Sequence, residues 1–300
     1  MGALAVTAAY LEHFTDQDVA LLCSDAPQID IRDRRNFLRT YPDGLDGILS
    51  SRRVFEAVFS SEKGSDPLCG ASPFFVFSVA MHHTAVRLKS TGYVSERLGP
   101  GRRAPVFDVD ELRGFVAMPW HRYFLAELLA SYTHVASGSV VVSTPRGLRR
   151  QRFSELDPVR FAGLLDVVSD AERPGILRRL GDLALFLTGV FPDHVARQGF
   201  GPIAEGRLLR ASGIASAGRE GLPREPGAAA FGDRGAVELL EQLGQRWYGA
   251  AAALLADPLA ENVAVLRELP HRFRQARRVL SVLTEQCLFG HRDQWFGMAD

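Results

Sequence analysis

The sequence predicts an all-α or mainly α protein, an irregular bundle of many helices with at most a minor β element around residues 139–143. Three observations carry this prediction. Apolar residues recur at helical spacing through most of the 300-residue chain, several segments begin with residues that cap helices, and strand patterns are scarce. With 46% hydrophobic and 23% charged residues, the chain has enough apolar side chains to form a sizeable core.

Three helices and one turn are expected in the first 60 residues. The first helix begins at Thr15, which is followed three residues later by Asp18, the spacing of a capping box. Residues 30–40 and 50–60 have the pattern of short amphipathic helices. Between them, YPDGLDG (41–47) contains the proline and glycines that are typical of turns, so we predict a turn there.

The segment SPFFVFSVAMHHTA begins a longer helix. Ser72 is a favoured N-cap and Pro73 is favoured at the first helical position, while Gly92 is expected to end the helix. Residues 98–110 are rich in glycine, proline and arginine and are expected to form a loop. Pro119 begins the next helix.

One short strand is expected at residues 139–143, which contain three consecutive valines. A helix is then expected from Ser154 or Asp157 to residue 169. The apolar run at 175–191 predicts a further helix.

Asp182 lies inside this apolar run, where a carboxylate is costly to bury unless it is paired. Arg178, one helical turn earlier, is a possible partner. A buried carboxylate can also act as an acid or base with a shifted pKa. We favour a structural role, in which Gly181 and Asp182 mark a break and Asp182 caps a new helix.

The composition changes along the chain and predicts its organisation. Residues 1–198 are expected to form the main helical domain. Residues 199–235 are dense in glycine, alanine and proline, which predicts a flexible loop or linker with one short helical turn. Residues 236–300 return to helical patterning and are expected to pack on the main domain, with the tail around Trp295 docking back on the protein.

Charge and cysteine content limit the classes of partner and compartment. The 35 basic and 35 acidic residues give a net charge of zero, which argues against bulk nucleic acid or an anionic membrane as the main partner. The three widely spaced cysteines favour a reducing compartment, and the N-terminus lacks the pattern of a signal peptide. No apolar run approaches the ~20 residues of a membrane span, so we expect a cytoplasmic protein.

Histidines are the candidate metal ligands. A helical wheel places His82 and His121 on the inward faces of their two helices, and facing helices are where bundle proteins bind metals or haem. His134 and Glu127, at the edge of the second helix, are the further candidate ligands. His83 is expected at a boundary. The alternative, which we favour, is that the inward histidines are core residues whose nitrogens are hydrogen-bonded.

Arginines form two clusters, which lie in PRGLRRQRF (145–153) and in RELPHRFRQARRVL (267–280). A surface of this kind contacts phosphates or an acidic protein, although the zero net charge favours solvated helix faces balanced by acidic neighbours. The candidate residues of this patch are Arg149, Arg150, Arg152, Arg274, Arg277 and Arg278.

No motif in the sequence identifies a reaction, since GxSxG, HExxH and a phosphate-binding loop are all absent. We therefore expect a non-catalytic binding, adaptor or regulatory protein that acts through a protein partner or as a homo-oligomer. The first alternative is a metal- or haem-dependent helical enzyme or sensor that uses the inward histidines. The second alternative is a nucleic-acid-binding protein that uses the arginines.

Overall fold

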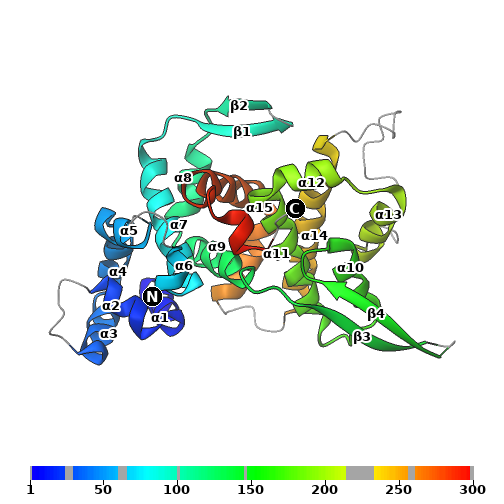
Figure 1. The fold of residues 1–300 in the computed structure, drawn as a ribbon, viewed down its shortest axis with the longest axis horizontal. Coiled ribbons are helices and arrows are strands. Elements are labelled where there is room, and N and C mark those ends of the chain that lie inside the picture. Colours follow the sequence, from blue (N-terminus) through cyan, green and yellow to red (C-terminus); the bar gives the residue numbers. More distant parts are fainter. Residues whose placement is uncertain are drawn as a thin grey trace. The chain divides into compact units, whose positions relative to one another are not determined.

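The computed structural model describes residues 2–23, 30–59, 66–99, 102–144, 147–213, 233–255 and 261–297 (Figure 1). These residues are mainly helical and include two two-stranded sheets, which confirms the predicted fold class. The chain forms two compact units, which we describe separately. Unit 1 comprises Met1–Val94, Val106–His134 and Val279–Asp300, and unit 2 comprises Ser95–Pro105 and Val135–Arg278.

Unit 1 is a bundle of short helices around one long one. Its helices are α1 (Gly2–His13), α2 (Asp16–Leu22), α3 (Ile31–Thr40), α4 (Pro42–Leu49), α5 (Arg52–Phe59), α6 (Pro67–Gly70), α7 (Pro73–Ser90), α8 (Asp110–Ala117), α9 (Pro119–Ser131) and α16 (Arg292–Trp295). The central helix α7 contacts α4, α5, α6, α8 and α9, and most of its side chains are buried.

The predicted capping box of α2 is present and also holds α7. The Thr15 hydroxyl accepts a bond from the Asp18 backbone, and the Asp18 carboxylate accepts one from the Thr15 backbone at 2.8 Å. The same carboxylate accepts bonds from the Ser72 backbone and hydroxyl, and Ser72 caps α7 as predicted. A fully buried Asp18 thus joins the starts of two helices.

The turn predicted at residues 41–47 is wrong, because this segment lies in α4. Pro42 occupies the first turn of the helix, where its missing N–H is tolerated. The helix then runs through Gly44 and Gly47 to Leu49. This correction matters for function because α4 carries Asp46.

The chain near the C-terminus is part of unit 1 and packs against its other elements. The indole N–H of Trp295 donates to the Asp66 carboxylate at 2.8 Å, and both Trp295 and Phe296 contact the ring of Phe77. Trp295 and Phe296 are buried.

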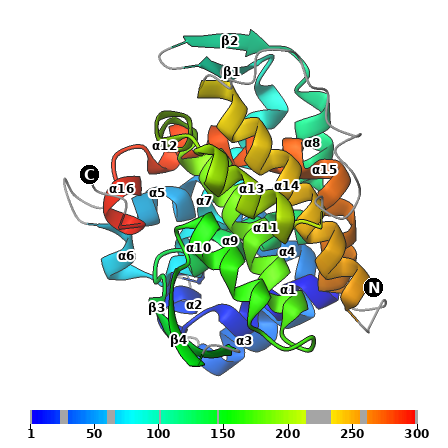
Figure 2. The ribbon, with the colours of Figure 1, turned by 90° about the vertical axis from the view of Figure 1, so that its right-hand side faces the viewer.

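Unit 2 is built on two helices that lie side by side, α11 (Arg173–Val190) and α14 (Asp233–Leu254) (Figure 2). The predicted break at Gly181 is wrong, because α11 is continuous. Gly181 instead permits close packing, since a Cβ there would lie 2.7 Å from the ring of Tyr248. Asp182 accepts a hydrogen bond from the Tyr248 hydroxyl at 2.8 Å and pairs with Arg178 at 3.9 Å.

The strand predicted at 139–143 lies in β3 (Ser137–Thr144), but it has a partner, β4 (Gly147–Ser154). The two strands pair antiparallel with Val141 opposite Arg150. The loop predicted at 98–110 is wrong in part, because β1 (Val94–Gly99) and β2 (Arg102–Val106) form the second small sheet. The three missed strands, β1, β2 and β4, each contain arginine and lack the apolar alternation by which strands are recognised.

The remaining elements of unit 2 are α10 (Pro158–Ala162), which Asp157 caps, a 3₁₀ turn (Gly163–Asp166), α12 (Pro192–Gln198) and α13 (Pro202–Ala211). The last of these lies within the predicted linker 199–235, of which residues 214–232 are outside the described residues. Helix α15 (Glu261–Leu283) belongs to unit 2 up to Arg278, whereas its end and the π-helical turn that follows it (Thr284–Leu288) belong to unit 1. No described helix has both the length and the apolar character of a membrane span.

Candidate functional site

The candidate site begins at His82, one of the two histidines that end the apolar run of α7. Its side chain is 2% exposed, as the helical wheel predicts. The ring contacts two oxygens: Nδ1 lies 2.8 Å from the Ser78 carbonyl and Nε2 lies 3.1 Å from Oδ1 of Asp46.

Asp46 of α4 is the centre of this polar cluster. Its Oδ1 accepts from His82 and from an Nη2 hydrogen of Arg122 on α9. The hydrogen bond from His82 and the positive charge of Arg122 lower the pKa of Asp46 to about 2. The carboxylate is therefore ionised at neutral pH, and it remains half exposed.

Arg122 is held on two sides. Its Nη1 donates to the carbonyls of Val116 and Ala117, at 2.6 Å and 3.3 Å, so the guanidinium also closes the end of α8. Arg122 is 7% exposed, and its buried Nε has no hydrogen-bond partner among the described residues. A hydrogen bond from this donor to an oxygen atom of a ligand or a water molecule would be favourable.

Tyr10 of α1 is a second donor of this kind. It is 3% exposed, and its ring lies 5.7 Å from that of His82 and 5.2 Å from that of Tyr123. Burial raises the pKa of Tyr10 far above its ordinary value, so the phenol stays neutral and able to donate. Its hydroxyl is buried without a hydrogen-bond partner among the described residues.

These groups line a pocket of about 510 Å³ in unit 1, between α1, α4, α7, α8 and α9. Lys89 and Arg113 also line it, and Asp46 is its only carboxylate among the described residues. A volume of several hundred Å³ with apolar walls and a few polar groups is typical of a small-molecule site. The apolar walls include Val6, Leu45, Leu49, Ala85, Val116 and Pro119.

The chemistry that the cluster offers is mainly hydrogen-bond donation. His82 is already bonded to two oxygens, and the hydrogen bond from His82 and the charge of Arg122 keep Asp46 ionised. The two donors with an unmet bond belong to Tyr10 and Arg122. Such an arrangement can orient and hold an oxygen-bearing molecule.

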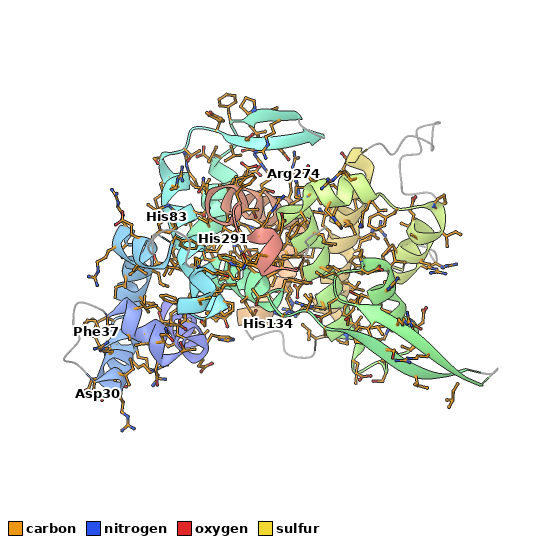
Figure 3. All side chains as sticks on the ribbon, viewed as in Figure 1. Asp30, Phe37, His83, His134, Arg274 and His291 are labelled. Atoms are coloured by element: carbon orange, nitrogen blue, oxygen red, sulfur yellow. The ribbon has the colours of Figure 1, made fainter. Side chains whose placement is uncertain are left out.

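The four predicted metal ligands are not gathered by the fold. His121 is 3% exposed, as expected, but its Nδ1 donates to the Phe115 carbonyl at 3.0 Å and its ring stacks on Phe115. His134 lies exposed beyond the end of α9, next to Thr133 (Figure 3). Glu127 is half-buried on α9. No three His, Cys, Asp or Glu side chains in the described ranges come together as a metal site.

His83 is the boundary residue that the helical wheel predicts. It is half-buried, and its ring stacks on Phe55 of α5 at 3.7 Å (Figure 3). Burial and the charge of Arg87 lower the pKa of His83. This contact fixes α5 on α7 and lies outside the pocket.

The predicted arginine patch comes from two different elements of unit 2. Arg277 of α15 is held between Glu96 at 2.8 Å and Glu241 at 2.9 Å, and the buried Arg278 lies 3.8 Å from Glu96. Arg274 lies 3.7 Å from Glu96 and is more exposed (Figure 3). This cluster balances charge inside unit 2.

The other three arginines lie on β4. Arg150 and Arg152 are exposed, and Arg150 donates to the Ser139 hydroxyl at 2.6 Å. The side chain of Arg149 lies outside the described residues. Arg150 and Arg152 of β4, together with Arg274 of α15, are therefore the described part of the predicted patch that is exposed.

Sequence reasoning found His82 but not its partners. Asp46 was hidden because its segment was interpreted as a turn, although a proline at the first helical position was a usable signal. Tyr10 and Arg122 had no signal of their own, since the unmet bonds depend on what surrounds each side chain in the fold.

No protein-family model, no curated protein and no solved structure matches this chain.

Proposed function

We propose that the protein is a non-catalytic binding protein whose pocket in unit 1 takes a small organic molecule. The observation that carries the proposal is the pair of buried, unmet donors, the hydroxyl of Tyr10 and Nε of Arg122, in residues that line one pocket. Buried polar groups are nearly always hydrogen-bonded in proteins. Both atoms have almost no accessible surface, so a bound molecule with an oxygen atom satisfies them when these side chains turn towards the pocket.

The apolar walls support the same proposal. Leu45 and Leu49 are almost fully buried and line the pocket together with polar side chains. A ligand with an apolar body gains affinity by leaving water, and the polar groups fix its orientation. We also propose that the protein is regulatory and that binding of the small molecule controls it. We propose a cytoplasmic location, because its three cysteines are free thiols.

The test is a ligand screen with a blocked variant. Ala117→Trp places a large side chain at the exposed rim of the pocket, whereas Met118→Trp places one on the next residue, which does not line it. We expect ligand-observed NMR of a compound library to find molecules that bind the wild-type protein and Met118→Trp but not Ala117→Trp. A library in which every binder tolerates Ala117→Trp would contradict the proposal.

A second candidate function is that of an adaptor, and the β3–β4 hairpin favours it. The register puts Val141 opposite Arg150 and Ser139 opposite Arg152, so these side chains share one face with Leu148. Val141 is 66% exposed and Leu148 is 79% exposed. Residues 137–154 contain no carboxylate, so an acidic, partly apolar segment of a partner protein is the complementary surface.

Charge reversal tests the adaptor function. A photo-crosslinking residue at Leu148 should capture a partner in the native cell, and Arg150→Glu with Arg152→Glu should abolish the capture. The matched control reverses two exposed arginines elsewhere in unit 2, Arg160→Glu with Arg197→Glu, and should leave it intact. Capture that survives the β4 reversal contradicts the adaptor function, and capture of nucleic acid would favour the nucleic-acid alternative.

A further inference from the structure

The charges around the pocket identify a class of ligand, an inference that rests on the proposed function. Lys89, Arg113 and Arg122 line the pocket with permanent positive charges, while Asp46 is the only carboxylate among its described lining residues. The side chains of the lining therefore carry more positive than negative charge.

Asp46 does little to reduce the positive potential at the rim. Its Oδ1 is shared between His82 and Arg122, so its negative charge is already matched within the cluster. This leaves the charges of Lys89 and Arg113 without a carboxylate in the pocket wall.

Arg113 is held at the end of α7, the part of the helix that carries Lys89. Arg113 donates to the carbonyls of Leu88 and Thr91, at 2.9 Å and 2.8 Å, and these two residues flank Lys89 at the end of α7. Its ion pair with Asp110 is at the surface, because the Asp110 side chain is 90% exposed, so solvent screens that pair. The Lys89 ammonium makes no ion pair with any residue in the described ranges, and Lys89 is exposed.

Apolar surface connects this rim to the buried end of the pocket. Val86 follows His82 by one helical turn on α7 and is 41% exposed, whereas Val116 and Leu49 are buried. A molecule that reaches from Lys89 towards Tyr10 would therefore place an apolar body against these side chains.

We propose that the pocket binds an organic acid, whose carboxylate or phosphate group meets Lys89 and Arg113 at the rim while its apolar body lies between α4, α7 and α8. Two cations bind an oxyanion with charge-assisted hydrogen bonds, which are stronger than neutral ones. A neutral molecule of the same shape gains only the apolar contacts. The pocket thus selects by charge at the rim and by shape inside.

Matched pairs of probes test this inference by calorimetry at low salt. The pairs are 4-phenylbutyrate with 4-phenylbutanamide, octanoate with octanamide, and phenyl phosphate with phenol. We expect at least one acid to bind about tenfold more tightly than its neutral partner, and the advantage to shrink as salt is added. Comparing phenyl phosphate with the carboxylates shows which oxyanion is preferred.

A charge-removal pair shows whether the rim is responsible. Lys89→Met and Arg87→Met remove the same charge from the same helix, but only Lys89 lines the pocket. We expect Lys89→Met to weaken the binding of the acid about fivefold or more and Arg87→Met to leave it unchanged. Equal affinity for acid and neutral probes, or equal effects of the two substitutions, overturns the inference.

The outcomes also separate this inference from the proposed function. If library compounds bind and are blocked by Ala117→Trp but acids have no advantage over neutral molecules, the ligand class is wrong and the binding function stands. If nothing is blocked by Ala117→Trp, both fail.

Discussion

Two buried tyrosines, one in each unit, differ in the hydrogen bonding of their hydroxyl groups. Tyr248 of unit 2 is fully buried, and its hydroxyl donates to Asp182 at 2.8 Å. Tyr10 of unit 1 is 3% exposed, and its hydroxyl has no hydrogen-bond partner among the described residues. A buried hydroxyl without a partner is destabilising, so the fold bears a penalty at Tyr10 that it avoids at Tyr248.

The surroundings explain the difference. Tyr248 lies where α11 and α14 meet, and Gly181 allows its ring to approach the backbone closely. Tyr10 faces a cluster in which Arg122 is itself a donor, and both line an open pocket. The first environment provides a partner for its tyrosine hydroxyl, while the second leaves the hydroxyl of Tyr10 and Nε of Arg122 without a hydrogen-bond partner among the described residues.

The largest loss of stability is expected when a side chain is introduced at Gly181, where the backbone contacts the ring of Tyr248. In Gly181→Leu, the new Cβ would lie within 3 Å of three ring atoms, so the ring must move away from Asp182. Overpacking together with the lost hydrogen bond should reduce the free energy of unfolding by about 3 kcal/mol. Urea unfolding measures it, and Gly175→Leu in the same helix, with open space around its Cα, should cost nothing.

A smaller loss is expected from Tyr248→Phe. This change removes the hydroxyl that donates to the buried Asp182 carboxylate at 2.8 Å. Hydrogen bonds to charged groups contribute about 2 kcal/mol, so the free energy of unfolding should fall by that amount. A change within error of zero would show that Tyr248 and Tyr10 are equivalent and would remove the basis of the contrast.

The contribution of Asp46 to the free energy of unfolding should decrease as the pH falls. Folding lowers its pKa from 3.8 to about 2, through the hydrogen bond from His82 and the charge of Arg122, so the folded state favours the ionised form. This stabilisation is fully present above pH 4 and is lost as the pH falls from 4 through 2. Since Asp46 is half exposed, it should amount to about 1 kcal/mol.

The check is acid unfolding of Asp46→Asn, followed by circular dichroism. Its difference in stability from the wild-type protein should shrink between pH 4 and pH 2. Asp33→Asn, an exposed carboxylate on α3, is the control and should show no such change. A constant difference across this range would contradict the role assigned to Asp46.

The sequence predicted individual helices and their buried faces better than it predicted contacts between helices. Caps and apolar periodicity predicted α2, α7 and α9, and the wheel placed His82 and His121 inside. These signals are local, because a few neighbouring residues determine a helix cap and the buried face of a helix. The α4 helix was missed because proline and glycine are typical of both turns and helix starts.

The candidate site could not be predicted from the sequence, because its residues are far apart in the chain and come together only in the fold. Asp46 and Arg122 are 76 positions apart and meet through the contacts of α4, α7 and α9. Similarly, Gly181 was expected to break a helix, whereas its role is set by the ring of Tyr248, 67 positions later. Neither relation follows from residue type or spacing.

The smallest effect is expected from Tyr10→Phe, and it is the most informative. Because the hydroxyl has no partner among the described residues, removing it should change the free energy of unfolding by less than about 0.5 kcal/mol, or increase it. The same substitution at Tyr248 should be clearly destabilising. A ligand that bonds to the Tyr10 hydroxyl should bind the variant more weakly, so the hydroxyl would affect binding without supporting the fold. A strong loss of stability without ligand would instead assign Tyr10 the structural role that Tyr248 has.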